Sequence, residues 1–159
     1  MAGRADSRRK SCVSLPPEEV DLEFPFDDAG CFGCSSRNSW GLKLRFRRRG
    51  TLVVGSFSID DRFHGAPGIA HGGIVATILD EYSCAAAVFL ADQRVVTGEL
   101  QVRYERPCPV ECVLDVSAAV VDSSHPRYLR IDAEIHLDGT RVACSSGKFF
   151  AAPVERPCP

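Results

Sequence analysis

A histidine, two glycines and an acid stand in fixed order near the middle of the chain, as His71-Gly72-Gly73 and Asp80. Paired glycines ahead of an apolar run predict a helix start where the backbone comes close to another group. The free N–H groups of a helix N-terminus stabilise developing negative charge, for example on the oxygen of an approaching carbonyl. Asp80 could act as a general base on water or attack the carbonyl directly. The sequence leaves both roles of Asp80 open.

The spacing of these groups sets a geometric condition. Asp80 lies eight residues beyond Gly72, which is about 12 Å along one helix at about 1.5 Å per residue. One carbonyl cannot touch both groups of a single chain. If both act, they must come from two subunits, and a two-fold axis then creates two identical sites in a dimer interface.

Simpler interpretations exist for each of these side chains. Asp80 could be a buried structural acid, and His71 could fix the loop rather than carry a proton. Glu81 points about 100° away from Asp80 on the helix, so we expect it to form a salt bridge toward solvent or an interface. Cys84 follows Asp80 by one turn and could line a pocket. As a nucleophile it would need a partner that stabilises its thiolate, and the sequence shows none.

Cys31 and Cys34 have the Cys-x-x-Cys spacing of half a zinc site. A structural zinc site needs two more ligands, and only Cys108, Cys112 or His64 could supply them, through the tertiary structure. We therefore predict no metal and interpret the pair as buried thiols in an apolar turn. A redox role is less favoured, because a redox pair usually opens a helix after a strand, and this pair precedes a strand.

Hydrophobic periodicity predicts the elements that position these groups. The run 74–90 is apolar nearly all round and predicts a buried central helix. A loop over 60–70 leads into it, and the arginine run 47–49 is interpreted as a solvated turn, with anion binding as the alternative. Alternating runs predict strands, with Asp138-Gly139 as a hairpin turn. The predicted strands are 42–47, 51–59, 96–104, 112–120, 129–137 and 141–151.

The first strand after the helix carries the candidate Thr97. Strict alternation assigns its side chains to two faces. One face would hold Val96, Leu100, Val102 and Tyr104, and the opposite face would hold Thr97, Glu99, Gln101 and Arg103.

One long helix followed by consecutive strands favours an antiparallel sheet over βαβ units. We predict an α+β fold in which a curved antiparallel sheet of about six strands wraps round the central helix. The length suits one domain with a real core. We place this domain at 22–152, between a flexible tail at 1–21 and a C-terminal tail at 153–159.

Composition limits the partners and the compartment. A formal net charge of −2 gives no electrostatic argument for a nucleic-acid partner. Residues 1–10 are basic and polar without a following apolar stretch, so we expect no secretory signal. Asp80 and Glu81 argue against a membrane-spanning role for the helix. We therefore expect the eight cysteines to be reduced thiols of a cytoplasmic protein.

Several motifs occur together between Cys31 and Ala151. They are Pro67–Gly73, Leu79-Asp80-Glu81, Val96–Tyr104 and Arg106–Pro109, with Cys31–Cys34, Asn38 and Gly41-Leu42 as a lead-in. In this combination the chain resembles the PaaI-like group of hotdog-fold thioesterases, to which the human THEM proteins also belong. The lead-in resembles that of bacterial members.

The resemblance implies hydrolysis of an acyl-coenzyme A or acyl-carrier-protein thioester, without a cofactor, by a homodimer or a homotetramer built as a dimer of dimers. It implies that Asp80 is the catalytic acid and that the Gly72 N–H polarises the thioester carbonyl. It implies that Thr97 positions the attacking water or the intermediate, and His71 is grouped with these residues. The substrate-binding residues that we assign with them are Gly73, His64, Gly98, Glu99 and Arg103.

One departure from the family pattern concerns His64. Some relatives have an asparagine six residues before the histidine of the His-Gly-Gly motif, and Gly65 occupies that position here. The neighbouring His64 is the side chain that could replace the asparagine.

Other function classes remain as alternatives. A non-catalytic acyl-thioester binding or assembly module would share the fold, but loss of Asp80 or of the glycines would be expected for it. A hydratase would need an Asp/His pair that reaches one substrate, and no Asp-x-x-x-x-His segment lies in the helix lead-in. A zinc-stabilised domain would depend on Cys31 and Cys34. The sequence does not identify the acyl chain.

Overall fold

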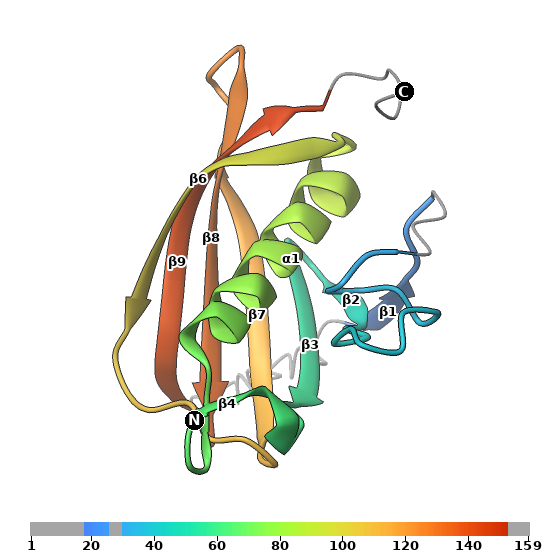
Figure 1. The fold of residues 1–159 in the computed structure, drawn as a ribbon. Coiled ribbons are helices and arrows are strands. Elements are labelled where there is room, and N and C mark those ends of the chain that lie inside the picture. Colours follow the sequence, from blue (N-terminus) through green and yellow to red (C-terminus); the bar gives the residue numbers. More distant parts are fainter. Residues whose placement is uncertain (1–17, 26–29, 153–159) are drawn as a thin grey trace, which may run out of the picture.

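A computed structural model describes residues 18–25 and 30–152, and Figure 1 shows its fold. Its elements in chain order are β1 (Glu19–Leu22), β2 (Phe46–Arg49), β3 (Leu52–Ser58), the 3₁₀ helix η1 (Asp61–Phe63), β4 (His64–Ala66), β5 (Ile69–Ala70), α1 (Gly72–Ala91), β6 (Val95–Tyr104), β7 (Val113–Asp122), β8 (Tyr128–Leu137) and β9 (Thr140–Ala151). Seven strands form one antiparallel sheet in the order β1-β2-β3-β7-β8-β9-β6, and β4 pairs with β5. The predicted α+β fold is confirmed, with one strand more than expected.

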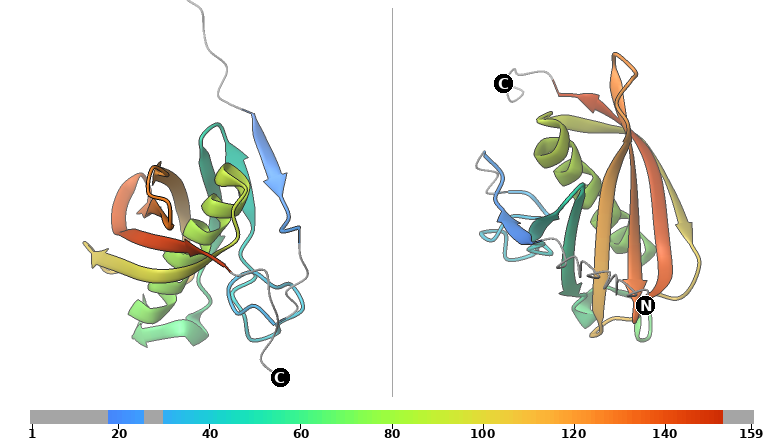
Figure 2. Two further views of the ribbon diagram at one scale, coloured as in Figure 1. Left: turned by 90° about the horizontal axis from the view of Figure 1, so that it is seen from above. Right: turned by 180° about the vertical axis from the view of Figure 1, so that it is seen from behind.

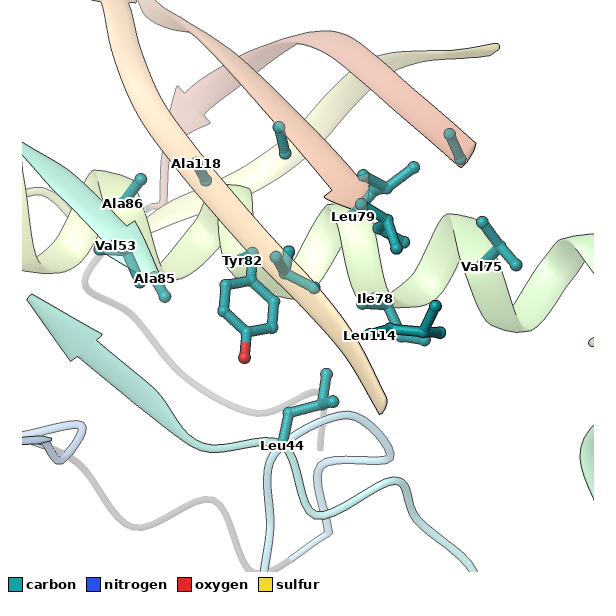
Figure 3. Close-up of a cluster of buried hydrophobic side chains, with 14 of the residues drawn as sticks. Leu44, Val53, Val75, Ile78, Leu79, Tyr82, Ala85, Ala86, Leu114 and Ala118 are labelled. Carbon is teal, nitrogen blue, oxygen red and sulfur yellow. The ribbon is translucent and has the colours of Figure 1, made fainter. Parts of the chain in front are cut away.

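The sheet curves round α1, which crosses its concave face (Figures 1 and 2). By length and hydropathy α1 resembles a membrane-spanning helix, but it lies against β3, β6, β7, β8 and β9. Figure 3 shows Ile78, Leu79 and Tyr82 of α1 among core side chains that include Leu114 of β7. All four are fully buried. Core burial therefore explains why α1 is apolar nearly all round.

The helix is longer than the predicted 74–90 because both ends are capped. His71 is the N-cap, so the two glycines belong to the first turn. At the other end Asp92 adopts a left-handed conformation with φ 52°, and its N–H bonds to the Ala87 carbonyl. Asparagine and aspartate tolerate this conformation better than most residues.

Two predictions ahead of the helix were wrong in detail. The strand predicted at 42–47 begins only at Phe46, because residues 42–45 pair with a turn instead. Leu42 and Leu44 donate backbone hydrogen bonds to the carbonyls of Phe32 and Gly33, at 2.8 and 2.9 Å. The predicted loop at 60–70 contains η1 and the β4–β5 hairpin.

The predicted boundary after residue 21 was also wrong, because it cuts through β1. Glu19 of β1 forms ion pairs with both Arg47 and Arg49 of β2. Arg48 bonds to the Gly50 carbonyl at 3.0 Å. The arginine run is therefore a paired strand end, which disfavours the anion-binding alternative. The remainder of the predicted tails, 1–17 and 153–159, lies outside the described residues.

The strands after the helix agree with the predicted alternation in β7 and β8, and β9 forms where the last strand was predicted. The hairpin turn between β8 and β9 has positive φ at both Asp138 (48°) and Gly139 (74°), as a type I′ turn requires. In β6 the alternation was wrong. Its pairing with β9 shifts by one residue between Thr97 and Glu99, so a β-bulge at Gly98 changes which side chains face the helix.

Candidate active site

The side chains of Asp80 on α1 and Thr97 on β6 contact each other between the helix and the sheet. The Thr97 hydroxyl donates a hydrogen bond of 2.7 Å to Asp80 Oδ1. Burial raises the pKa of Asp80 above its ordinary value, and the bond from Thr97 opposes part of that shift. A carboxylate that is costly to ionise is a stronger base once ionised. The pair is therefore suited to proton transfer or nucleophilic attack.

The bulge at Gly98 explains how Thr97 reaches the helix. Leu100 and Val102 beyond the bulge pack against the core, and strict alternation would turn Thr97 to the other face. The extra residue restores Thr97 to the helix side. Glu99 remains on the outer face, where it pairs with Lys148 at 2.7 Å. The structure therefore separates Thr97 from Glu99, with which the sequence grouped it.

Cys84 lies beside this pair. Its sulfur is 3.8 Å from the Thr97 hydroxyl. Burial, with the charge of Asp80 as a second cause, raises the pKa of Cys84 to about 12. The thiol is therefore neutral near pH 7 and forms part of the wall rather than a nucleophile.

The start of α1 forms a second polar locus. His71 Nδ1 accepts the N–H of Gly73 at 3.0 Å, so this nitrogen carries no proton in that contact. Gly73 is therefore occupied as a donor. Among the described residues, the Gly72 N–H has no hydrogen-bond acceptor. Of the two glycine donors that the sequence indicated, Gly72 is the one available to a ligand.

Tyr104 is a residue of this locus that sequence reasoning placed on a strand face but not in the site. Its hydroxyl donates to the Gly72 carbonyl at 2.9 Å and so ties the end of β6 to the helix start. Gly72 and Tyr104 line a groove of about 420 Å³ that continues along Arg106 and Pro107. The Arg106–Pro109 motif could have indicated this groove, because it follows Tyr104 directly.

The structure does not bring all predicted site residues together. Gly72 and Asp80 lie two turns apart on α1, as the spacing required. His64 is exposed on β4, and its Nδ1 lies 2.6 Å from the Asp61 carbonyl. Arg103 lies on β6 beyond the bulge, in register with Cys144, and shares the outer face with Glu99. In this chain neither His64 nor Arg103 joins the Asp80–Thr97 pair.

The structure contains a third cluster of polar side chains, which the sequence did not predict. Cys34 donates to Cys31 with 3.1 Å between the sulfurs, and Cys31 donates to Glu81 Oε1 at 3.4 Å. Glu81 is thus half-buried against the turn, whereas the sequence predicted that it points toward solvent or an interface. Burial raises the pKa of Cys34 well above its ordinary value, and the Cys31 bond and the charge of Glu81 add to this. Only the tertiary fold joins Glu81 to the two cysteines.

Comparison with known proteins agrees with this architecture. The family model of the thioesterase superfamily matches residues 67–144, from the loop before the helix start into β9. The chain is similar to THEM-like proteins of this superfamily over these residues, and it has the hotdog fold of the solved thioesterase-superfamily structures.

Two curated relatives carry the name acyl-coenzyme A thioesterase. THEM4 of Xenopus laevis is 41% identical over 56 residues, which are 35% of this chain and 25% of that protein. THEM5 of Homo sapiens is 32% identical over 97 residues, which are 60% of this chain and 38% of that protein. The chain therefore matches less than half the length of either relative.

Solved structures share the fold at low sequence identity. A thioesterase superfamily protein has a TM-score of 0.66 at 24% identity, covering 73% of this chain and 57% of its own. A hypothetical thioesterase from Streptococcus pneumoniae TIGR4, solved with coenzyme A, has a TM-score of 0.60 at 21% identity, covering 64% and 82%.

Proposed function

We propose that this protein hydrolyses an acyl-coenzyme A thioester to the free acid and coenzyme A. The observation that carries the proposal is the half-buried Asp80, held by Thr97 at 2.7 Å on the central helix of a thioesterase-superfamily fold. The names of the THEM relatives and the coenzyme A in the pneumococcal structure support this substrate class. An acyl-carrier-protein thioester has the same reacting group and is the alternative substrate.

In the proposed reaction the Gly72 N–H donates to the thioester oxygen and stabilises the negative charge that develops there. Asp80 takes a proton from water as the oxygen of that water bonds to the carbonyl carbon. The carbon–sulfur bond then breaks, and the proton that Asp80 took from water passes to the leaving thiolate, which gives the free thiol and returns Asp80 to its carboxylate form. In the nucleophilic variant Asp80 bonds to the carbon first, and water hydrolyses the mixed anhydride. Thr97 holds the carboxylate in place in both variants.

The two polar loci support a site shared between two copies of the chain. Gly72 and Asp80 are about 12 Å apart along α1, so each would serve a different substrate. β6 is an end strand of the sheet and is ten residues long, with Val96 and Tyr104 about half exposed. Among the described residues no further strand pairs with this edge of β6, and a long edge of this kind is suited to pairing with a second copy. We therefore propose a dimer, with Gly72 of one copy facing Asp80 of the other.

Free thiols support the expected compartment. The six cysteines among the described residues are all free, although Cys31 and Cys34 have sulfurs 3.1 Å apart. Adjacent thiols persist in a reducing environment such as the cytoplasm, which we propose as the location.

A panel of acyl-coenzyme A substrates with thiol detection tests the activity. We expect turnover by the wild-type protein and a loss of about 100-fold or more in Asp80→Asn. Asp92→Asn is the matched control, because asparagine is also tolerated at this left-handed helix cap. Tight binding without turnover across the panel would instead identify a non-catalytic binding module.

The same variant reports whether lost activity reflects lost structure. Because the folded state raises the pKa of Asp80, ionising Asp80 costs stability as pH rises through the unfolded and then the folded pKa. Above both values the neutral asparagine avoids this cost. We therefore expect Asp80→Asn to unfold at pH 8 no more easily than wild type, measured by thermal denaturation.

A further inference from the structure

Three potential metal ligands converge where the turn at Cys31–Cys34 meets the central helix. One donor atom from each of Cys31, Cys34 and Glu81 lies within 4.8 Å of the other two. The sulfurs are 3.1 Å apart, and Cys31 Sγ is 3.4 Å from Glu81 Oε1. A tetrahedral zinc ion binds sulfur at about 2.3 Å and carboxylate oxygen at about 2.0–2.2 Å, which separates its donors by roughly 3.5–3.8 Å. Small side-chain rotations would reach that spacing.

The turn is fixed in place around Glu81. A Cβ at Gly33 would lie 2.2 Å from Glu81 Cγ, so only glycine lets the helix side chain enter the turn. The Cys34 N–H points at Cys31 Sγ at 3.4 Å, and this contact holds the two cysteines of the turn together. Two preformed thiol ligands and a carboxylate in a fixed frame reduce the ordering cost of binding an ion.

The segment after the turn is attached to the same helix. Arg45 donates to the Cys34 carbonyl at 3.1 Å. The Arg45 carbonyl in turn accepts the hydroxyl of the buried Tyr82 at 2.8 Å. The turn and the segment that follows it are thus connected to α1 at two consecutive residues, Glu81 and Tyr82. A group that joined Cys31 and Cys34 to Glu81 would strengthen this attachment.

We propose that Cys31, Cys34 and Glu81 bind one zinc ion per chain, with water as the fourth ligand. Binding forms two zinc–sulfur bonds and one zinc–oxygen bond, and each thiol that is protonated beforehand releases its proton to solvent. Thiolate ligands select zinc over the hard cations magnesium and calcium. The ion joins the turn to α1 at the residue that follows Asp80. This site is distinct from the proposed hydrolytic site, because Glu81 is turned toward Cys31 whereas Asp80 accepts the hydroxyl of Thr97.

Cobalt substitution tests the site without reference to activity. Full-length protein is reduced, stripped with a chelator and titrated with Co²⁺, which absorbs in the near-ultraviolet and visible when thiolates bind it in tetrahedral geometry. We expect saturation at one Co²⁺ per chain and bleaching of the spectrum by Zn²⁺. Cys31→Ser and Cys34→Ser should each weaken binding by more than about 100-fold, since even outer-shell changes cost up to about that much.

Two variants separate a lost ligand from a lost fold. Glu81→Gln keeps the size of the side chain but removes its charge, and it should weaken Co²⁺ binding while circular dichroism is unchanged. Cys144→Ser changes a cysteine outside the cluster and should bind as wild type does. The proposal would be overturned if the reduced wild-type protein gave no Co²⁺ absorption spectrum. It would also be overturned if all of these variants retained the spectrum. A third contrary result would be that the protein, once reduced, takes up no metal and instead forms a Cys31–Cys34 disulfide.

Discussion

At the scale of single residues, the proposed role of Asp80 depends on a position in which ionising its carboxyl group costs stability. It is one of two acids on a helix that carries no other charged side chain, and burial raises its pKa. Thr97 compensates part of this cost by donating to the carboxylate. The two side chains therefore act as one unit, and a change in Thr97 should be visible in the titration of Asp80.

Replacing Thr97 tests this coupling. Thr97→Val keeps the shape but removes the donor, and a hydrogen bond to a charged group contributes about 1.5–3 kcal/mol. We expect kcat/KM to fall about 10-fold or more. Because the lost bond favoured the ionised form, the pKa of Asp80 rises and the acidic limb of the pH–rate profile moves to higher pH. Thr97→Ser should keep both properties near wild type, and an unmoved limb in Thr97→Val would contradict the coupling.

The sequence indicates the candidate residues Asp80 and Gly72 more readily than the side chains that surround them. Asp80 and Gly72 stand out because an acid in an apolar run and a pair of glycines can both be recognised from the sequence alone. The contact of Cys31 with Glu81 spans 50 residues and no local pattern contains it. Glu81 was therefore assigned to solvent or an interface. The bond between Tyr104 and Gly72 was missed for the same reason.

At the scale of elements, the hydrophobic periodicity of the sequence predicted α1 and the long strands. It did not predict the irregularities of the backbone that determine which way side chains point. Alternation in β6 placed Thr97 on the outer face, because a bulge adds one residue without changing composition. Residues 42–45 alternate like a strand, yet their backbone bonds to the turn at Phe32 and Gly33. In both places the tertiary pairing overrides the local pattern.

The bulge in β6 has a testable consequence. A Cβ at Gly98 would lie 2.4 Å from the ring of Phe150, so Gly98→Ala must shift that half-buried ring or the bulge. Overpacking of this kind costs about 1–3 kcal/mol, and displacement of a catalytic group by about 1 Å can cost about 100-fold in rate. We expect kcat/KM to fall about 10- to 100-fold while the protein stays folded.

Gln101→Ala, an exposed change on the same strand, is the control for this variant and should leave kcat/KM near wild type. Thermal denaturation of both variants separates misplacement of Thr97 from general loss of structure. Full activity in Gly98→Ala would show that the bulge does not position Thr97.

At the scale of the whole molecule, the proposed function assigns two halves of a site to each chain rather than one complete site. The free Gly72 N–H and the Asp80–Thr97 pair lie on the same helix but too far apart to act on one carbonyl. The unpaired edge of β6 lies beside both, since Thr97 and Tyr104 belong to that strand. A second copy that pairs along this edge would bring the opposite half-site to each substrate.

Mixed dimers test this arrangement directly. Gly72→Pro removes the N–H while fitting the fold, because proline is tolerated at the first helical position. The preceding His71 already has φ −61° and ψ 135°, which proline requires of its neighbour. We expect Gly72→Pro to lose about 100-fold in kcat. Alone, Gly72→Pro and Asp80→Asn should therefore both be nearly inactive.

Co-expression of the two inactive variants in equal amounts should restore about one quarter of wild-type activity. Half of the dimers are then mixed, and each mixed dimer has one site that carries both defects and one site that carries neither. Differently tagged subunits allow the mixed dimers to be isolated and measured at about half of wild-type activity. The control pairs Gly72→Pro with the double variant that carries both changes, in which no intact site can form. If isolated mixed dimers stay as inactive as that control, Gly72 and Asp80 do not act across the interface.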